Sequence, residues 1–134
     1  MKIKLFIAIT AFSFASCSTD NLDVTKAKES AENCLRAIDQ GDYTSVTSEY
    51  YSSELASSES SAELTDKFKK LKEVTGAMQS FELRESAMEA AIGEESKIIL
   101  VYTVKHARIS TNEKFIIVLE SGKYKIASHD IKNE

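Results

Sequence analysis

The chain has 134 residues, a length typical of a single domain. Its 21 Asp and Glu residues outnumber its 17 Lys and Arg residues, which gives a formal net charge of -4 at pH 7. This balance argues against nucleic-acid binding, because a phosphate backbone requires a basic face. Two cysteines are too few for a disulfide framework. Two histidines and one cysteine within the domain predict no metal site, and we expect no other cofactor.

The N-terminal segment has the layout of a secretory signal. Lys2 and Lys4 form a basic start, an apolar stretch follows over residues 5–14, and small residues come next. The apolar stretch is too short to cross a bilayer, which needs about 20 apolar residues. We therefore expect residues 1–16 to act as a signal peptide and take no part in the fold.

The residues at the end of this segment, Phe14-Ala15-Ser16-Cys17, resemble a bacterial lipobox. The resemblance implies that Cys17 becomes the new N-terminus and carries acyl chains such as palmitate, which attach the protein to a membrane. By the same resemblance, a non-acidic residue at Ser18 implies the outer membrane. We expect the domain to face the periplasm. The alternative is an ordinary secretory cut after Ala15, without lipid.

The chain is thus expected to comprise a signal peptide (1–16), a lipidated cysteine with a short tether (17–22) and a single domain (23–134). The tether has five flexible residues, 18–22, with a root-mean-square reach of about 12 Å. Such a short tether would hold the domain close to the membrane surface.

Apolar residues at helical spacing predict a first helix from the Asp23 cap to about Ile38, ended by Gly41. Cys34 lies on its apolar stripe, which predicts a buried thiol; the alternative is a disulfide with Cys17, open only if Cys17 carries no lipid. A second, shorter helix is expected over residues 43–51, followed by a Ser-rich loop over residues 52–61. The third helix is expected to start at a capping box of Ser60 and Glu63 and to end at Gly76.

The second half of the domain is rich in β-branched and aromatic residues. Strands are expected over residues 97–109, 114–120 and 123–131, with polar turns at 93–96 and 110–113 and a tight hairpin at Ser121-Gly122. The segment 78–92 has two interpretations: it is a strand throughout, or it becomes a helix from about residue 84. A strand would complete a four-stranded antiparallel meander. Helices followed by strands predict an α+β fold, with N-terminal helices packed on a curved four-stranded antiparallel sheet.

Two segments resemble the nuclear-transport-factor-two-like superfamily, whose domains are cystatin-like cones of the ketosteroid-isomerase type. Residues 38–43 (IDQGDY) resemble its opening helix end, and residues 122–126 (GKYKI) with Asp130-Ile131 resemble its closing strand. The overall likeness is to small bacterial lipoproteins of this superfamily. Its members include enzymes, transport adaptors and proteins of unknown activity, so the resemblance does not fix a function.

Strand alternation places Tyr102 and His106 on one face of the second expected strand, and Ser128 and Asp130 on one face of the last. If both faces line the interior of the cone, these four side chains would meet and could perform general acid–base chemistry. The alternative is an apolar core with a solvated polar rim. No motif identifies a catalytic residue.

Residues 98–101 and 115–119 are apolar at consecutive positions, so both faces of the sheet are apolar there. One face would pack against the helices. The other apolar face should also be covered, either by a second copy of the chain in a homodimer or by the chain's own helices and loops.

We expect a membrane-anchored envelope lipoprotein whose domain binds a small ligand or an envelope protein without catalysis. Two alternatives remain open. One is a small isomerase or hydrolase that uses His106, Asp130 and Tyr102. The other is an acidic inhibitor or adaptor of a basic envelope protein.

Overall fold

The computed structural model describes residues 22–90 and 92–134. The expected signal peptide and the lipid-attachment residue Cys17 lie outside the described residues. The elements follow one another as α1 (Val24–Gln40), α2 (Tyr43–Ser45), the π-helical turn η1 (Val46–Tyr50), α3 (Ser53–Ser58), α4 (Ser61–Thr75), β1 (Met78–Glu89), β2 (Lys97–His106), β3 (Ser110–Glu120) and β4 (Lys123–Asn133). This order of helices and then strands confirms the expected α+β fold.

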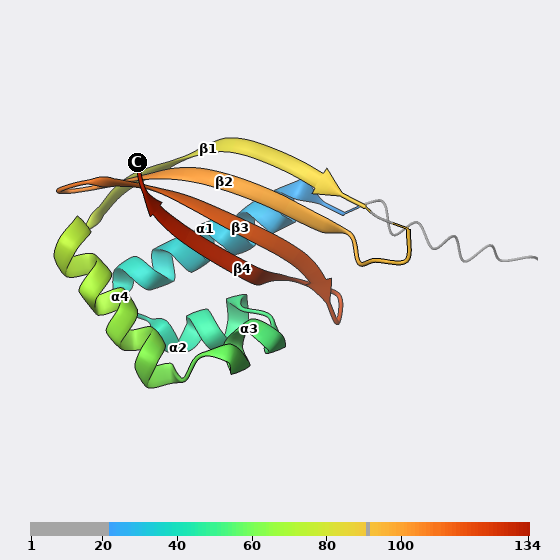
Figure 1. Cartoon of the computed structure of the whole chain (residues 1–134), viewed down its shortest axis with the longest axis horizontal. Helices are drawn as coiled ribbons and strands as arrows, with labels where there is room; N and C mark the ends of the chain where they lie inside the picture. Colours follow the sequence, from blue (N-terminus) through green and yellow to red (C-terminus); the bar gives the residue numbers. More distant parts are fainter. Residues whose placement is uncertain (1–21, 91) are drawn as a thin grey trace, which may run out of the picture.

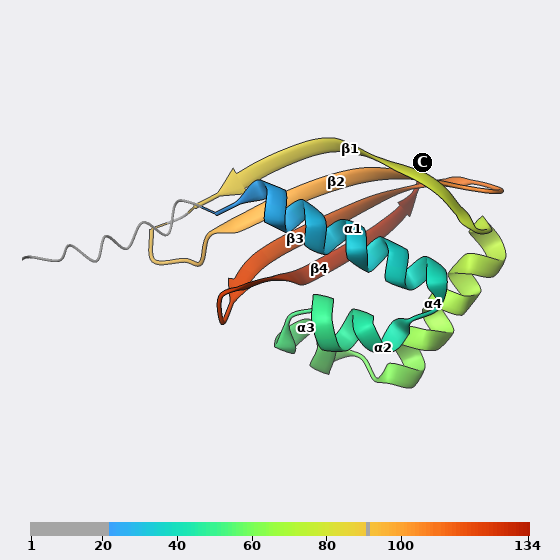
Figure 2. The same ribbon diagram turned by 180° about the vertical axis from the view of Figure 1, so that it is seen from behind.

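The four strands form one curved antiparallel sheet in the order β1-β2-β3-β4. The helices lie on one face of this sheet, which Figure 1 shows from the strand side and Figure 2 from the helix side. We call the face that meets the helices the inner face and the opposite one the outer face. The core fills the space between the inner face, α1 and α4.

The ends of α1 form as the sequence predicts. The Asp23 carboxylate accepts a hydrogen bond from the Thr25 backbone N–H at 2.9 Å, which caps the helix. Gly41 ends it with a φ of 77°, a conformation that glycine adopts without strain. Cys34 is fully buried on the inner stripe as a free thiol, and burial raises its pKa, so the expected buried thiol is confirmed.

The Ser-rich segment is not the uninterrupted loop that its composition predicts, because residues 53–58 form α3. The Ser52 hydroxyl accepts a hydrogen bond from the Leu55 N–H at 3.2 Å and caps the helix. The Ser52 N–H donates to the carbonyl of Ile126 in β4, and Leu55 packs against the core. Contacts distant in sequence thus stabilise a helix that has little hydrophobic periodicity of its own.

Helix α4 carries the expected capping box. The Ser60 hydroxyl accepts from the Glu63 N–H at 3.2 Å, and the Glu63 carboxylate accepts from the Ser60 N–H at 3.1 Å. Leu64 and Phe68 are buried on its inner side. Gly76 ends the helix, and the chain turns there into β1.

The strand boundaries differ from the expectation at one turn. Residues 78–89 form β1, so the interpretation of this segment as a strand is confirmed up to Glu89. Strand β2 ends at His106 and β3 already begins at Ser110. The polar residues 110–113, expected to be a turn, therefore belong to a strand, because Thr111 and Glu113 find polar partners inside the protein.

The hairpin between β3 and β4 forms at Ser121 and Gly122, as expected. Both residues have positive φ values, 50° and 78°, as in the two-residue turn that joins twisted antiparallel strands. None of the described helices is long and apolar enough to cross a membrane.

Candidate functional site

A bulge in β4 decides which side chains of the last strand face the helices. Ile117 pairs with Ile126, but Ile116 pairs with Ser128, so Ala127 is an extra residue in β4. The extra residue reverses the alternation from this point on. His129 and Ile131 consequently lie on the inner face, next to Phe115 and Glu113 of β3.

Both histidines of the chain approach the carboxylate of Glu113 on the inner face. The His129 Nε2 atom lies 2.8 Å from one carboxylate oxygen. The Thr111 hydroxyl donates to the other oxygen at 2.9 Å, and the His106 Nε2 atom lies 4.0 Å from it. The Glu113 side chain is only 4% exposed and that of His129 only 2%. Glu113 is therefore a buried carboxylate held by three polar side chains.

Tyr51 extends this network toward η1. Its hydroxyl lies 3.2 Å from Nδ1 of His129, and the His129 ring stacks on Phe115 with centroids 4.2 Å apart. With Nε2–H donating to Glu113, the Nδ1 atom of His129 accepts from the Tyr51 hydroxyl, so both ring nitrogens have a partner. At the other end, His106 Nε2 lies 3.3 Å from the Thr111 hydroxyl. We call these five side chains, Tyr51, His129, Glu113, Thr111 and His106, the polar network.

Burial alone would raise the pKa of Glu113, but the hydrogen bonds that its carboxylate accepts from His129 and Thr111 outweigh this effect. The pKa of this carboxyl consequently lies below its usual range, and Glu113 is ionised at neutral pH. Burial raises the pKa of the Tyr51 phenol, with a smaller contribution from neighbouring acidic groups. Tyr51 is therefore a hydroxyl donor at any physiological pH.

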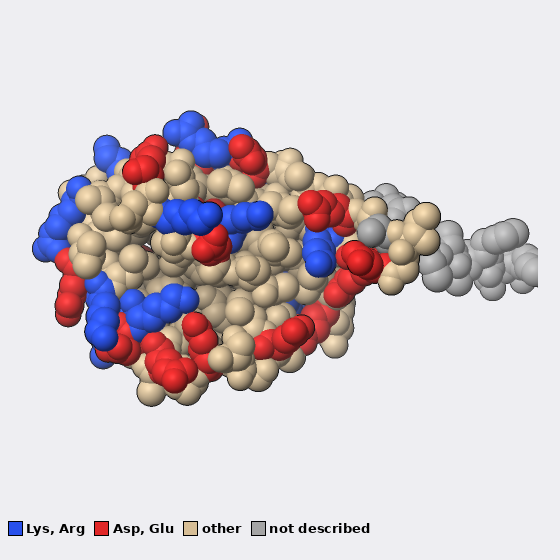
Figure 3. Space-filling model, in the orientation of Figure 1, with Lys and Arg blue, Asp and Glu red and all other residues tan. Residues whose placement is uncertain are grey.

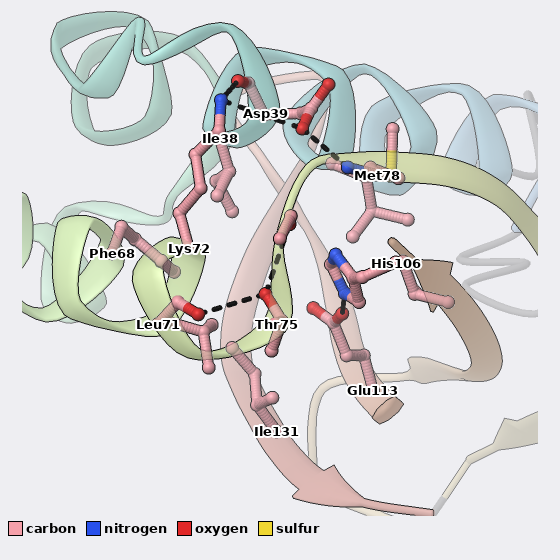
Figure 4. A pocket seen from close by; sticks show the side chains of 13 residues that line it. Ile38, Asp39, Phe68, Leu71, Lys72, Thr75, Met78, His106, Glu113 and Ile131 are labelled. Atoms are coloured by element: carbon pink, nitrogen blue, oxygen red, sulfur yellow. Dashed lines mark hydrogen bonds and ion pairs between the residues drawn. The ribbon is translucent and has the colours of Figure 1, made fainter. Parts of the chain in front are cut away.

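A small cavity lies beside the network, between the C-terminal ends of α1 and α4 and the inner face of the sheet (Figure 4). Its volume is about 30 Å³, room for one or two water molecules. Leu35, Ile38, Phe68 and Leu71 give it apolar walls, and His106 and Glu113 lie at its polar end. The Nδ1 atom of His106 is buried and has no hydrogen-bond partner among the described residues.

An ion pair closes one side of this cavity. The Lys72 ammonium donates to the backbone carbonyl of Asp39 at 2.5 Å and lies 3.9 Å from its carboxylate. The same carboxylate accepts from the Met78 N–H at 2.9 Å. Asp39 therefore joins the end of α1, the end of α4 and the start of β1 at the cavity mouth.

The four residues singled out from the sequence do not form one site. Tyr102 and His106 lie on the inner face, as expected, and Tyr102 is fully buried. Its hydroxyl has no hydrogen-bond partner among the described residues, and burial raises its pKa. Ser128 and Asp130 are on the outer face because of the bulge, and Asp130 is 56% exposed and pairs with Lys132. The expected grouping of His106, Asp130 and Tyr102 is therefore wrong.

Sequence reasoning missed Glu113, Thr111, His129 and Tyr51. A signal for the first two was present, because Thr111, Glu113, Phe115 and Ile117 alternate along one strand face. No local signal distinguishes His129 from its neighbours, since its orientation depends on the bulge at Ala127. Tyr51 reaches the network from a distant segment, through an isolated bridge to Ile126.

A chain of tyrosine, histidine and carboxylate can transfer protons in principle. Here the hydrogen-bonding atoms of His129 and Glu113 contact other members of the network. Within residues 22–90 and 92–134, no group of three or more His, Cys, Asp or Glu side chains is arranged to hold a metal ion.

No family model matches the chain. No curated protein is significantly similar to it.

Proposed function

We propose that this chain is a membrane-anchored envelope lipoprotein whose domain binds a small ligand or a protein partner without chemical transformation. The observation that carries the non-catalytic part is the polar network. Its Glu113 and His129 side chains are almost completely buried and bind each other. The adjacent cavity of about 30 Å³ is about a tenth of the size at which pockets for drug-sized ligands begin.

The anchoring part rests on the N-terminal sequence, in which a short apolar stretch precedes Cys17. Metabolic labelling with palmitate tests it directly, by comparing the wild-type chain with the Cys17→Ala variant. Label in the wild type and none in the variant is the expected result. Equal labelling of the two chains would overturn the lipid anchor. Cys34→Ala is the matched control, because Cys34 is buried and its replacement should leave the label unchanged.

The cavity next to His106 and Glu113 is the place that we propose for a small ligand, and its volume of about 30 Å³ limits that ligand to the size of one or two water molecules. It combines apolar walls with a buried ring nitrogen that can accept a hydrogen bond. Native mass spectrometry of the full chain, extracted from the envelope in detergent, would show a retained ligand as added mass. The same protein after unfolding and refolding is the control for ligand loss.

Two outcomes separate a ligand in this cavity from other bound material. A ligand held at the polar end of the cavity should be lost in the His106→Leu variant. It should be kept in the control Lys105→Leu, because the Lys105 side chain is exposed to solvent. Added mass that is equal in both variants would place the ligand elsewhere. If the mass spectrum instead shows the chain bound to another protein and carrying no small ligand, the result would favour binding of a protein partner at the surface.

We further propose that the outer face of the sheet pairs with a second copy of the chain. Ile99, Val101 and Ile116 lie on this face and are only half-buried. Figure 3 views the molecule from this side and shows uncharged surface among charged side chains. Sedimentation at micromolar concentration should detect a dimer that Ile116→Lys disrupts and Ser80→Lys, at the exposed end of β1, does not. A wild-type chain that stays monomeric would contradict this interface.

A further inference from the structure

The start of α1 is fixed to one end of the sheet. The backbone N–H of Asp23 donates to the Tyr124 hydroxyl at 2.7 Å, and the Ser30 hydroxyl donates to the Tyr124 carbonyl at 2.9 Å. Tyr124 is the second residue of β4, close to the turn between β3 and β4. Figures 1 and 2 show the start of α1 near the end of β1, at the same end of the molecule as this turn and the connection from β1 to β2. We call this part of the molecule the tethered end.

Large apolar side chains are exposed at the tethered end. Met88, at the end of β1, is 44% exposed, Leu119, at the end of β3, is 40% exposed, and Ile92, between β1 and β2, is fully exposed. Met88 and Leu119 are on the inner face, opposite Ile98 and Tyr124. They are exposed because these strand ends extend beyond the first turn of α1 (Figure 2). Their exposure therefore follows from the architecture of the sheet.

We infer that the tethered end rests on the lipid bilayer, with Ile92, Met88 and Leu119 inserted at the boundary between headgroups and acyl chains. This inference rests on the proposed lipid anchor at Cys17. Only five residues separate Cys17 from Asp23. Leu22 among them packs against the core, which leaves four for the tether, with a root-mean-square reach of about 11 Å. An anchor so close to Asp23 brings the tethered end, and no other part of the domain, against the membrane.

Apolar side chains gain free energy when they leave water for the interfacial region of a bilayer. One acyl chain alone, or a few exposed side chains alone, bind a membrane weakly. Attachment through Cys17 holds the apolar side chains next to the bilayer, which raises their effective concentration at its surface. The short tether thus converts a weak apolar contact into a fixed orientation of the domain.

The charged residues near Ile92 indicate which kind of lipid headgroup this end contacts. Glu89, Glu94 and Glu95 lie around the connection between β1 and β2, and Lys97 is the basic residue beside them. At this connection their excess negative charge opposes contact of Ile92 with anionic headgroups, although Lys26 near the start of α1 and Lys123 after the β3–β4 turn also lie at the tethered end. The tethered end therefore fits a zwitterionic surface such as phosphatidylcholine or phosphatidylethanolamine.

The experiment uses the full-length lipidated chain in phosphatidylcholine vesicles, with a polarity-sensitive fluorophore on one introduced cysteine. Ile92→Cys places the probe at the tethered end. Ile109→Cys is the matched control, because Ile109 is an exposed isoleucine between β2 and β3 at the opposite end. Cys34 is fully buried and does not compete for the label.

Brominated lipids should quench the Ile92 probe at least threefold more than the Ile109 probe, and aqueous iodide should show the reverse order. Equal quenching of the two probes by brominated lipids, in chains that carry palmitate and remain on the vesicles, would overturn the inference while leaving the anchor intact. A chain without palmitate that does not bind vesicles would instead overturn the proposed anchor.

Two further measurements test what holds this end at the membrane. Replacing part of the phosphatidylcholine by phosphatidylglycerol should reduce quenching of the Ile92 probe by brominated lipids. An increase would show that charge attraction holds the end, contrary to the inference. Shielding of the Ile92 probe from iodide in native envelopes but not in protein-free vesicles would mean that this end binds a protein, which would also overturn it.

Discussion

The Nε2 atom of His129 lies 2.8 Å from a carboxylate oxygen of Glu113, and both side chains are almost completely buried. A buried carboxylate is tolerated only when donors surround it, and His129 and Thr111 supply those donors. The pair connects β3 to β4 at the point where the bulge changes the register. It therefore stabilises the curved end of the sheet on which α1 and α4 pack.

Replacing Glu113 by Gln should lower the free energy of unfolding by about 2 kcal/mol, because a charge-assisted buried hydrogen bond is lost. Urea unfolding followed by circular dichroism measures the change. Glu85→Gln is the control, since Glu85 is exposed on β1 and should change stability by less than about 0.5 kcal/mol. Losses of equal size in the two variants would mean that the polar network contributes nothing specific.

Stability should fall at acid pH through Glu113. Its folded pKa is lowered, so its contribution is present above the unfolded pKa of about 4.3 and is lost as pH falls through the folded value. The wild-type chain should therefore lose stability relative to Glu113→Gln between about pH 5 and the acid limit of the folded state. Urea midpoints measured at a series of pH values would test this; parallel curves for the two chains would disprove it.

Two tyrosines offer a matched test of the network. Tyr51→Phe removes the hydroxyl beside His129 Nδ1 and should lower the free energy of unfolding by about 1 kcal/mol, because a buried acceptor loses its donor. Tyr102→Phe removes a buried hydroxyl that has no partner among the described residues and should leave stability unchanged or raise it. Thermal and urea unfolding of both variants provide the comparison. The reverse order of effects would contradict the assignment of Tyr51 as a donor.

Gly76 should tolerate substitution less well than Gly41, although both follow a helix. A Cβ atom on Gly76 would lie 2.9 Å from the Cβ of Ala107, whereas one on Gly41 would have no neighbour within 4 Å. Gly76→Ala should therefore cost about 3 kcal/mol or more from strain and the close contact. Gly41→Ala should cost about 1 kcal/mol from its positive φ alone. Equal losses in urea unfolding would show that the turn at Gly76 adapts.

Local interactions made much of the fold predictable. The Asp23 cap, the Ser60–Glu63 capping box and the Ser121-Gly122 hairpin each depend on residues within a few positions of one another, and each forms as expected. The period of apolar residues likewise predicted the buried stripe of α1 and the inner face of β2 up to His106. Such features follow from backbone geometry that the sequence encodes directly.

The candidate site was not predictable in the same way, for two physical reasons. Residues 110–113 have the polar composition of a turn, yet Thr111 and Glu113 are buried. His106 bonds Thr111, His129 bonds Glu113, and Thr111 donates to Glu113, so both buried side chains have partners from inside the protein. The bulge at Ala127 then moves His129 inward and Asp130 outward. A single extra residue in one strand reverses every side chain after it, and pairing with the neighbouring strand defines its position.

The sequence by itself therefore determined the α+β order of elements, their caps and turns, and the acidic balance that argues against nucleic-acid binding. The tertiary structure decided which polar side chains meet: Glu113 with both histidines, and Tyr51 with His129. The physical reason is that caps and periodicity are set by neighbours along the chain, whereas the partners of a buried charge come from strands and helices that only folding brings together.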